Sequence, residues 1–337
     1  MKKVSKIISR VVMASAVVLV VAFVVLYIAT WGGAPVAETA AQDATIPQVT
    51  IDGVTFHAET FGDRASPVAV VVHGGPGADY RSLLSLQELA DQFYVVFYDQ
   101  RGTGLSPRVP TEELTLESAI ADLDRIVEHY GGGKPVGIVG HSWGAMLAAA
   151  YIGRHPEKVD KVVLAEPGAL TSEAFKAIAP YLGRMDIPLL WSGTLAWFES
   201  LHIHGPDEQA PMDHIWTSVG KAWSYAAWNG YNCPGTQAPP DFAWRYSAAS
   251  QHIIASASDE NGNVDLAPLS AGLDRYPNSV LFLVSACNRW IGLEHQQRYH
   301  IPLFKDTQVA IVPNAGHEMF GENPADSIAA VRAYLSE

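Results

Sequence analysis

Apolar and polar positions alternate along most of the chain in a way that predicts strands and helices in turn. From residue 47 onward, short runs rich in β-branched residues are followed by segments with apolar residues every three or four positions. A hairpin is expected to open this region, with its turn at Asp52-Gly53. The expected strands are 54–61, 68–72, 94–98, 135–139, 159–165, 280–284 and 309–312, and the expected helices are 82–90, 116–130, 145–153, 293–300 and 323–335. This order predicts an α/β fold with a mostly parallel sheet and helices on both faces.

The alternation stops for about a hundred residues, roughly over 167–270. This interval has poor strand signals, and we interpret it as a helical insertion over the carboxyl edge of the sheet, where α/β proteins bind ligands. Its aromatic residues either line a substrate cavity or form the core of a small helical subdomain. Most of the tryptophans lie here: Trp191, Trp197, Trp216, Trp223, Trp228 and Trp244.

The amino terminus combines a basic start with a long apolar run. Residues 1–10 carry four basic side chains, and residues 11–31 carry no charge. An apolar helix of about twenty residues spans the ~30 Å hydrocarbon layer of a bilayer, and a positive flank stays in the cytoplasm. We therefore expect residues 1–31 to be an uncleaved membrane anchor, with the rest outside the cytoplasm. A cleaved secretory signal and a buried core helix are the alternatives. Residues 32–46 are expected to form a short tether.

Charge and cysteine content exclude several classes of protein. The chain has 22 Lys and Arg against 35 Asp and Glu, a formal net charge of −13. Because phosphate binding requires clustered Lys and Arg, no nucleic-acid partner is expected. Two cysteines are too few for a disulfide scaffold or a four-thiolate metal site, and neither a metal nor a cofactor is expected. Outside the cytoplasm Cys233 and Cys287 would pair if the fold brings them together, which the sequence leaves open.

The strongest chemical motif is Gly140-His-Ser142-Trp-Gly144, between an expected buried strand and an expected helix. A serine in this G-x-S-x-G setting sits on a sharp turn that exposes its hydroxyl above the sheet. The flanking glycines remove side chains that would clash at the turn. Ser142 is therefore the candidate nucleophile.

A serine hydroxyl needs a base, and its reaction needs an oxyanion site. His317, in Asn314-Ala-Gly-His317, follows the last expected strand, which suits a Ser…acid…His order along the chain. His73-Gly-Gly-Pro-Gly77 follows the strand 68–72, and its glycines would let backbone N–H groups approach a developing oxyanion. The amide of Gly74 or Gly75, together with that of Trp143, is the candidate oxyanion hole.

These motifs, together with Asp99-Gln-Arg-Gly-Thr-Gly-Leu-Ser106, resemble the proline iminopeptidases of the α/β-hydrolase family. The resemblance covers roughly 47–165 and 279–337. It implies an α/β-hydrolase fold with an eight-stranded, mostly parallel sheet and a helical cap. The implied division is a first core part at 47–166, a cap at 167–270 and a second core part at 271–337. It also implies cleavage of an N-terminal residue, typically proline, from short peptides. The cap, which sets substrate choice, resembles the family weakly.

The acid of the triad is the point where the chain departs from its relatives. Relatives carry an Asp a few residues after the strand 280–284, and Asn288 falls at that place. A neutral amide cannot stabilise imidazolium as a carboxylate does. We therefore expect the acid to be Glu166, at the end of the neighbouring strand 159–165, and keep Asn288 as the alternative third position. Asp265, Asp274 and Glu294 are less well placed.

The expected reaction is acyl transfer from a small-molecule or short-peptide substrate, with His317 moving the proton and Glu166 orienting His317. An aminopeptidase must also bind a substrate ammonium, for which the cap offers Glu173, Glu199, Glu208 and Asp213. The alternatives are a carboxylesterase or lipase of the same fold and a non-catalytic, membrane-tethered binding protein. A dehalogenase or an epoxide hydrolase is disfavoured, because those enzymes need an Asp where Ser142 stands.

Overall fold

An eight-stranded, mostly parallel sheet forms the centre of the protein. The computed structural model describes residues 2–226, 228–258 and 264–337. The strands lie in the order β1-β2-β4-β3-β5-β6-β7-β8. The pairs β1–β2 and β2–β4 are antiparallel, and the other neighbouring pairs are parallel. Their bounds are β1 Gln48–Ile51, β2 Val54–Phe61, β3 Val68–Val72, β4 Tyr94–Tyr98, β5 Val136–His141, β6 Val159–Ala165, β7 Val280–Ser285 and β8 Thr307–Val312. The predicted fold class and the opening hairpin are confirmed.

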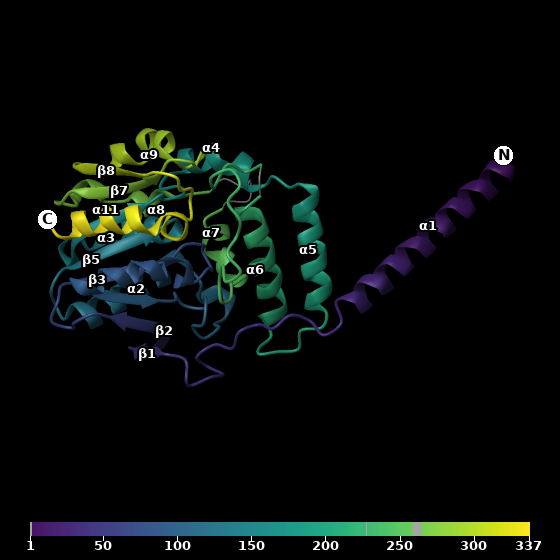
Figure 1. The fold of residues 1–337 in the computed structure, drawn as a ribbon, viewed down its shortest axis with the longest axis horizontal. Coiled ribbons are helices and arrows are strands. Elements are labelled where there is room, and N and C mark those ends of the chain that lie inside the picture. Colours follow the sequence, from purple (N-terminus) through teal and green to yellow (C-terminus); the bar gives the residue numbers. More distant parts are fainter. Residues whose placement is uncertain (1, 227, 259–263) are drawn as a thin grey trace.

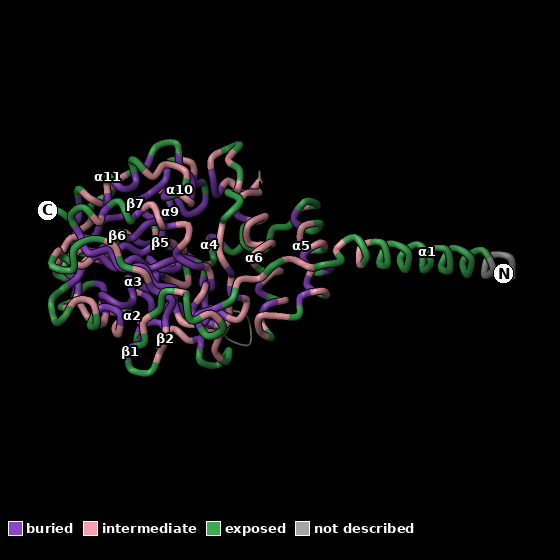
Figure 2. Tube along the Cα trace, turned by 60° about the horizontal axis from the view of Figure 1, so that its bottom comes forward, coloured by how far each residue is buried: buried purple, intermediate pink, exposed green. Residues whose placement is uncertain are grey.

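Helices cover both faces of the sheet, and most residues of its inner strands are buried (Figures 1 and 2). One face packs against α2 (Leu116–Gly131) and α3 (Trp143–Arg154), and the other packs against η1 (Tyr80–Asp91) and α11 (Pro324–Leu335). Alternate residues of β3 face opposite layers: Val70 packs on the side of α2 and α3, and Val71 packs on the side of η1 and α11. A strand covered on both faces therefore needs a continuous apolar run. The helix expected at 82–90 is a 3₁₀ helix.

The interval between β6 and β7 contains the helices α4 (Ser172–Leu182), α5 (Ile187–Ser200), α6 (Ala210–Ser224) and the short α7 (His252–Ala255). We call residues 167–270 the cap; residues 227 and 259–263 of this range lie outside the described residues. The cap stands at one end of the sheet, on the side where α1 leaves the body (Figure 1). Buried Arg245 binds Asp207 and Asp213, and Asp213 also binds Arg108 of the core. These ion pairs hold the cap to the core.

Helix α1 (Lys2–Ala29) projects away from the body as one long helix (Figure 2). Its segment Ile7–Ala29 is long and apolar enough to cross a membrane. Residues 32–46, which we predicted to form a short tether, contain neither a helix nor a strand. Thr39 and Ala40 are buried, and the Ala40 N–H donates to the Leu105 carbonyl at 2.8 Å. Part of this segment is therefore held against the body by a backbone hydrogen bond.

Candidate active site

Ser142 occupies a strained turn between β5 and α3. Its φ of 56° and ψ of −118° lie in a region that side chains rarely adopt. The turn is tight because a Cβ added at Gly144 would lie 2.0 Å from the Val72 carbonyl oxygen. The Ser142 N–H donates to the Ala165 carbonyl at 2.9 Å, which ties the turn to β6. The local geometry therefore has the form expected of a nucleophile elbow.

Glu166 and His317 come from different loops and meet in the core. Glu166 directly follows β6 with a φ of 43° and is fully buried. Its Oε2 accepts a hydrogen bond from His317 Nδ1 at 2.9 Å. The His317 loop is fixed from two further sides, since its N–H donates to the Tyr231 carbonyl and its carbonyl accepts from His141 Nε2. The structure thus brings together the acid and the base that the sequence named.

Asn288 lies at the same site and acts on the carboxylate. Its Nδ2 donates to Glu166 Oε2 at 2.8 Å, while its Oδ1 accepts from the N–H groups of Trp290 and Ile291. The hydroxyl and the N–H of Ser285 donate to Glu166 Oε1 at 2.6 and 2.8 Å. A second carboxylate at position 288 would face Glu166 and repel it, whereas the amide donates a hydrogen bond to it.

Burial sets the protonation of this pair. It raises the pKa of Glu166 to about 7, and the hydrogen bonds from Ser285 and Asn288 oppose that rise. Burial also lowers the pKa of His317 well below its usual value. A neutral imidazole that donates from Nδ1 to Glu166 leaves Nε2 as the basic nitrogen. His317 is therefore neutral in neutral solution, with Nε2 unprotonated.

The expected oxyanion loop lies against the serine. A Cβ added at Gly74 would lie 3.1 Å from the Ser142 Cβ, and Gly75 has a φ of 125°. Both positions therefore favour glycine. Gly74 and Gly75 line the same cavity as Ser142. Trp143 begins α3, where the first N–H groups have no partner within the helix.

Gln100 connects the oxyanion loop to the first residue of α3, a role that we did not predict. Its Nε2 donates to the His73 carbonyl at 2.9 Å, and its Oε1 accepts from Trp143 Nε1 at 2.9 Å. Its backbone N–H donates to His73 Nε2 at 3.0 Å, and His73 Nδ1 donates to the Gly74 carbonyl. Gln100 lies in Asp99–Ser106, one of the motifs that carry the family resemblance, but the motif does not indicate these contacts.

Ser142 and His317 open onto one cavity of about 510 Å³ between the sheet and the cap. The cap side of its wall is mainly apolar and aromatic: Leu182, Met185, Leu189, Trp216, Val219, Trp223, Tyr231, Phe242 and Tyr246. A cavity of this size and lining fits a small organic substrate with an apolar group. The expectation that cap aromatics line a cavity holds for Trp216 and Trp223.

The carboxylates expected to bind a substrate ammonium lie elsewhere. Among the described residues of the cavity wall there is neither Glu173, Glu199, Glu208 nor Asp213. Asp213 is committed to Arg108 and Arg245 inside the core, and Glu199 binds His214. The cavity instead has Glu318, directly after His317, and burial beside Glu322 raises its pKa to about 7. We did not predict Glu318, since its loop was interpreted through the histidine alone.

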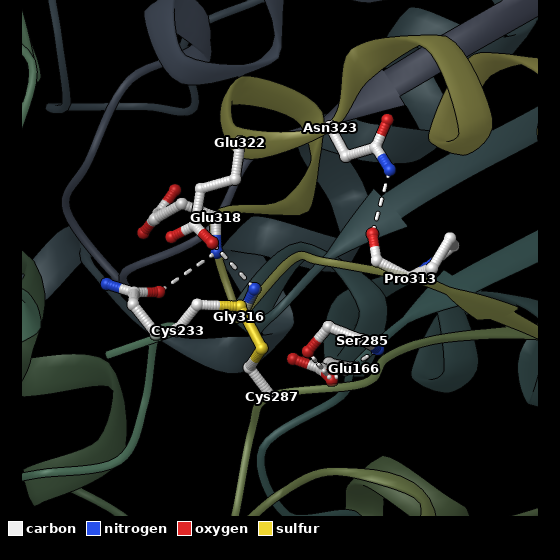
Figure 3. Close-up of a disulfide and its surroundings, with 10 residues drawn as sticks. Glu166, Cys233, Ser285, Cys287, Pro313, Gly316, Glu318, Glu322 and Asn323 are labelled. Carbon is white, nitrogen blue, oxygen red and sulfur yellow. Dashed lines mark hydrogen bonds between the residues drawn. A yellow bond between two sulfur atoms is a disulfide. The ribbon is translucent and has the colours of Figure 1, made fainter. Parts of the chain in front are cut away.

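A disulfide between Cys233 and Cys287 joins the cap to the loop after β7 (Figure 3). The sequence left this pairing open. On the cap side, Asn232 Oδ1 accepts from the Glu318 N–H at 3.4 Å. On the core side, the Cys287 N–H donates to the Ala315 carbonyl at 2.9 Å. The bond therefore holds the cap against the loop that carries His317.

Comparison with known proteins agrees with this fold. A family model described as alpha/beta hydrolase fold matches residues 67–324. The chain is 38% identical to a proline iminopeptidase of Heyndrickxia coagulans over 125 residues, which are 35% of this chain and 41% of that protein. It is 33% identical to epoxide hydrolase 4 of Mus musculus over 113 residues, 33% of this chain and 31% of that protein. The matched stretches thus span well under half the length of these relatives.

A solved structure of a membrane phospholipase A is similar over the whole length. It covers 100% of this chain and 98% of its own, with a TM-score of 0.59 and 19% sequence identity. At that identity the likeness concerns the fold alone. The family match spans most of the chain and includes strands β3 to β8, the Ser142 turn and the His317 loop. This protein belongs to the alpha/beta hydrolase fold family, and its core is similar to that of proline iminopeptidases.

Proposed function

We propose that this protein is a serine hydrolase that works through an acyl-enzyme. Ser142 is the nucleophile, His317 the general base and Glu166 the acid that orients His317. The observation that carries the proposal is the hydrogen bond from His317 Nδ1 to the buried Glu166, at a cavity whose wall also includes Ser142. Three of the groups that acyl transfer needs are then present: nucleophile, base and orienting acid.

In the proposed reaction, His317 Nε2 takes the proton of the Ser142 hydroxyl as Oγ attacks the substrate carbonyl carbon. The C=O electron pair moves onto oxygen, and the N–H groups of Trp143 and of Gly74 or Gly75 stabilise the oxyanion. The tetrahedral intermediate collapses as His317 protonates the leaving group. Water, deprotonated by His317, then attacks the acyl-enzyme, and Ser142 regains its proton while the acid is released.

We propose a carboxylic ester with an apolar acyl group as the substrate. The apolar and aromatic cap wall supports this choice, because burial of an acyl chain there removes it from water. The second candidate is the aminopeptidase activity predicted from the sequence. It is favoured by Glu318 on the cavity wall, which offers a carboxylate to a substrate ammonium, and by the proline iminopeptidase relatives.

We propose further that α1 is a retained membrane anchor and that the hydrolase lies outside the cytoplasm. The basic start of the chain and the 23-residue apolar segment support this topology. The Cys233–Cys287 disulfide supports it independently, since disulfides persist in oxidising compartments. A secreted form produced by signal cleavage is the alternative, and the mass of the mature protein separates the two.

A fluorophosphonate probe tests the reaction class. We expect the full-length protein in detergent micelles to be labelled and to hydrolyse p-nitrophenyl esters, and Ser142→Ala to lose labelling and about 10⁶-fold in kcat. Ser336→Ala, at the exposed carboxyl end, is the matched serine control and should react like the native protein. A native protein that neither labels nor hydrolyses esters or amides would be a non-catalytic binding protein, and the proposal would be wrong.

Proline-naphthylamide separates the two candidate substrates. An esterase hydrolyses p-nitrophenyl butyrate and leaves the amide intact. An aminopeptidase cleaves the amide, and Glu318→Gln then lowers the ratio of amide to ester turnover, because the ammonium loses its counter-charge. Amide turnover that equals or exceeds ester turnover would reject our preferred substrate in favour of the second candidate.

A further inference from the structure

Helix α5 presents an unusual outer face. Its exposed large side chains recur with helical spacing on one side of the helix, while Leu189 and Ala196 are buried on the other. Phe198 lies on the exposed side and is covered by the Phe23 ring of α1. Among the exposed residues of α5, all of which the structure describes, none is charged. The exposed large apolar side chains here and just before α5 are Tyr181, Leu182, Met185, Ile187, Leu190, Trp191 and Trp197. A contiguous apolar surface of this kind marks an interaction site rather than ordinary surface.

The membrane-spanning candidate α1 is in contact with this same helix. Phe23 packs on Phe198 and Trp197, with ring centroids 5.2 and 6.4 Å apart. Close to the end of α1, the Tyr27 carbonyl accepts a hydrogen bond from His202 Nε2 at 2.9 Å. In both views α5 lies at the base of α1, between it and the rest of the body (Figures 1 and 2). If α1 spans a bilayer, α5 therefore lies at the bilayer surface.

The active-site cavity opens at the same place. Its wall includes the turn between α4 and α5, and there Leu182, Gly183, Arg184 and Met185 are exposed. Leu182 and Met185 thus belong both to the cavity wall and to the exposed apolar surface. An amphiphile that lies in the outer leaflet could pass along apolar side chains from the surface to Ser142 without crossing water.

We propose that the outer face of the α4–α5 region is a bilayer-docking surface through which the cavity takes an ester-bearing amphiphile directly from the membrane. We call it the bilayer face and define it by Leu182, Met185, Ile187, Leu190, Trp191 and Trp197. The substrate part of this inference rests on the proposed function, and the docking part does not. Tryptophan is enriched at membrane interfaces, which suits Trp191 and Trp197.

A bilayer is favoured over a second copy of the chain as the occupant. The anchor α1 contacts α5 directly, so the membrane that holds α1 is present at the bilayer face at all times, whereas a second copy must diffuse to it. The exposed residues of α5 also offer no charge to orient a protein partner. An apolar surface with indole rings and one neighbouring exposed cation, Arg184, matches the boundary between headgroups and acyl chains.

Site-specific labelling of the full chain in lipid nanodiscs tests the docking. Both native cysteines are in the disulfide, so a single introduced cysteine accepts an environment-sensitive nitrobenzoxadiazole label. Ile187→Cys places the label at the bilayer face, where the native side chain is 82% exposed. The matched control is Ile311→Cys on the edge strand β8, where the native isoleucine is also exposed.

We expect doxyl-labelled lipid to quench the label at position 187 at least about two-fold and to leave position 311 unquenched. Equal quenching at both positions, or none at position 187, would overturn the proposal. A blue-shifted but unquenched label at position 187, with crosslinking between two such variants, would identify a second copy as the occupant and would also overturn it.

An activity measurement tests the substrate part separately. The double variant Ile187→Asp/Trp191→Asp should lose about ten-fold or more in turnover of a long-chain ester embedded in vesicles, while turnover of p-nitrophenyl acetate in solution is retained. Equal losses on both substrates would reject delivery from the membrane. Failure of the proposed function is seen differently: Ser142→Ala would keep full activity, and the lipid quenching at position 187 would be unaffected.

Discussion

The inner strands of the sheet bury their apolar residues, whereas helix α5 exposes several of its own. Val70 and Val71 of β3 point to opposite faces, and both are completely buried. On α5, Ile187 and Trp191 are exposed although they are equally apolar. Apolar residues of the core thus hold the loops of the candidate active site at fixed positions. The exposed apolar residues of the cap instead face the surroundings of the protein. The difference suggests that chemistry is set by the core and access by the cap.

The same contrast appears between the helices α3 and α5. Every residue of α3 except its last is buried, so the Ser142 turn rests on a completely packed element. Few residues of α5 are buried, and it contacts α6 on one side only. Substitutions in the core should therefore change kcat or stability, whereas substitutions on the cap surface should change substrate access.

The largest expected effect is on the acid of the core. Glu166→Gln should lower kcat about 10⁴-fold with little change in KM, because the amide neither stabilises the imidazolium of His317 nor favours its reactive tautomer. Adding Asn288→Asp should restore part of this loss, since a carboxylate then occupies the position used by relatives. Steady-state kinetics on a soluble ester measure both. Full activity of Glu166→Gln alone would show that another residue orients His317.

The next effect concerns the link between the two regions. Replacement of Cys233 and Cys287 by serine together opens a loop with a sequence separation of 54, which corresponds to about 4 kcal/mol of lost stability in the chain-entropy treatment. Thermal unfolding of the native and double-serine proteins in the same detergent measures it. If cap and core unfold independently, only the unfolding transition of the cap should move to lower temperature. An unchanged unfolding curve would contradict the coupling of cap and core through the contacts of Asn232 and Ala315.

A pair of glycines compares packing in the core and in the cap. Gly144→Ala should destabilise the protein by about 3 kcal/mol, because the new Cβ would lie 2.0 Å from the Val72 carbonyl oxygen. Gly183→Ala in the cap meets nothing within 4 Å at an ordinary φ of −89° and should change stability by less than about 0.5 kcal/mol. Denaturant unfolding of both variants is the measurement, and similar losses would contradict the contrast.

The smallest effect is a shift of the pH profile. The hydrogen bond from Asn288 lowers the pKa of Glu166, so Asn288→Ala should raise it above its value of about 7. Activity requires ionised Glu166, and the acid limb of kcat/KM should therefore move to higher pH. The loss should be several-fold near pH 6.5 and small near pH 9. An unchanged acid limb would show that Asn288 does not affect the pKa of Glu166.

The sequence was sufficient wherever a local rule decides the structure. Strand 68–72 needed only its continuous apolar run, and Ser142 needed only glycines between a strand and a helix. The choice of Glu166 followed from the chemistry of Asn288, because a triad without a carboxylate needs one nearby. The structure shows the hydrogen bond between Glu166 and His317, and the catalytic role of Glu166 stays a prediction. These features depend on neighbours in the chain or on strand order, both of which can be inferred without coordinates.

Other features depend on contacts between distant segments and could not be inferred. Gln100 joins His73 to Trp143 through its side-chain amide, and nothing in local periodicity indicates that contact. The sequence offered Asp213 as a carboxylate for a substrate, but in the structure Asp213 forms ion pairs with Arg108 and Arg245. The segment 32–46 is held by backbone groups, which composition does not reveal. Domain boundaries at 166/167 and 270/271 remain predictions.

The contact of Phe23 with Trp197 and Phe198 has a practical consequence for biochemical work on this protein. Removal of the first thirty residues to obtain a water-soluble form would also strip the partner ring from the outermost cap helix. Phe198, which α1 covers, would then be exposed beside Trp197, which is already partly exposed, and both rings could bind detergent. Rates measured on such a shortened enzyme would describe a different entrance from the one that operates in the cell.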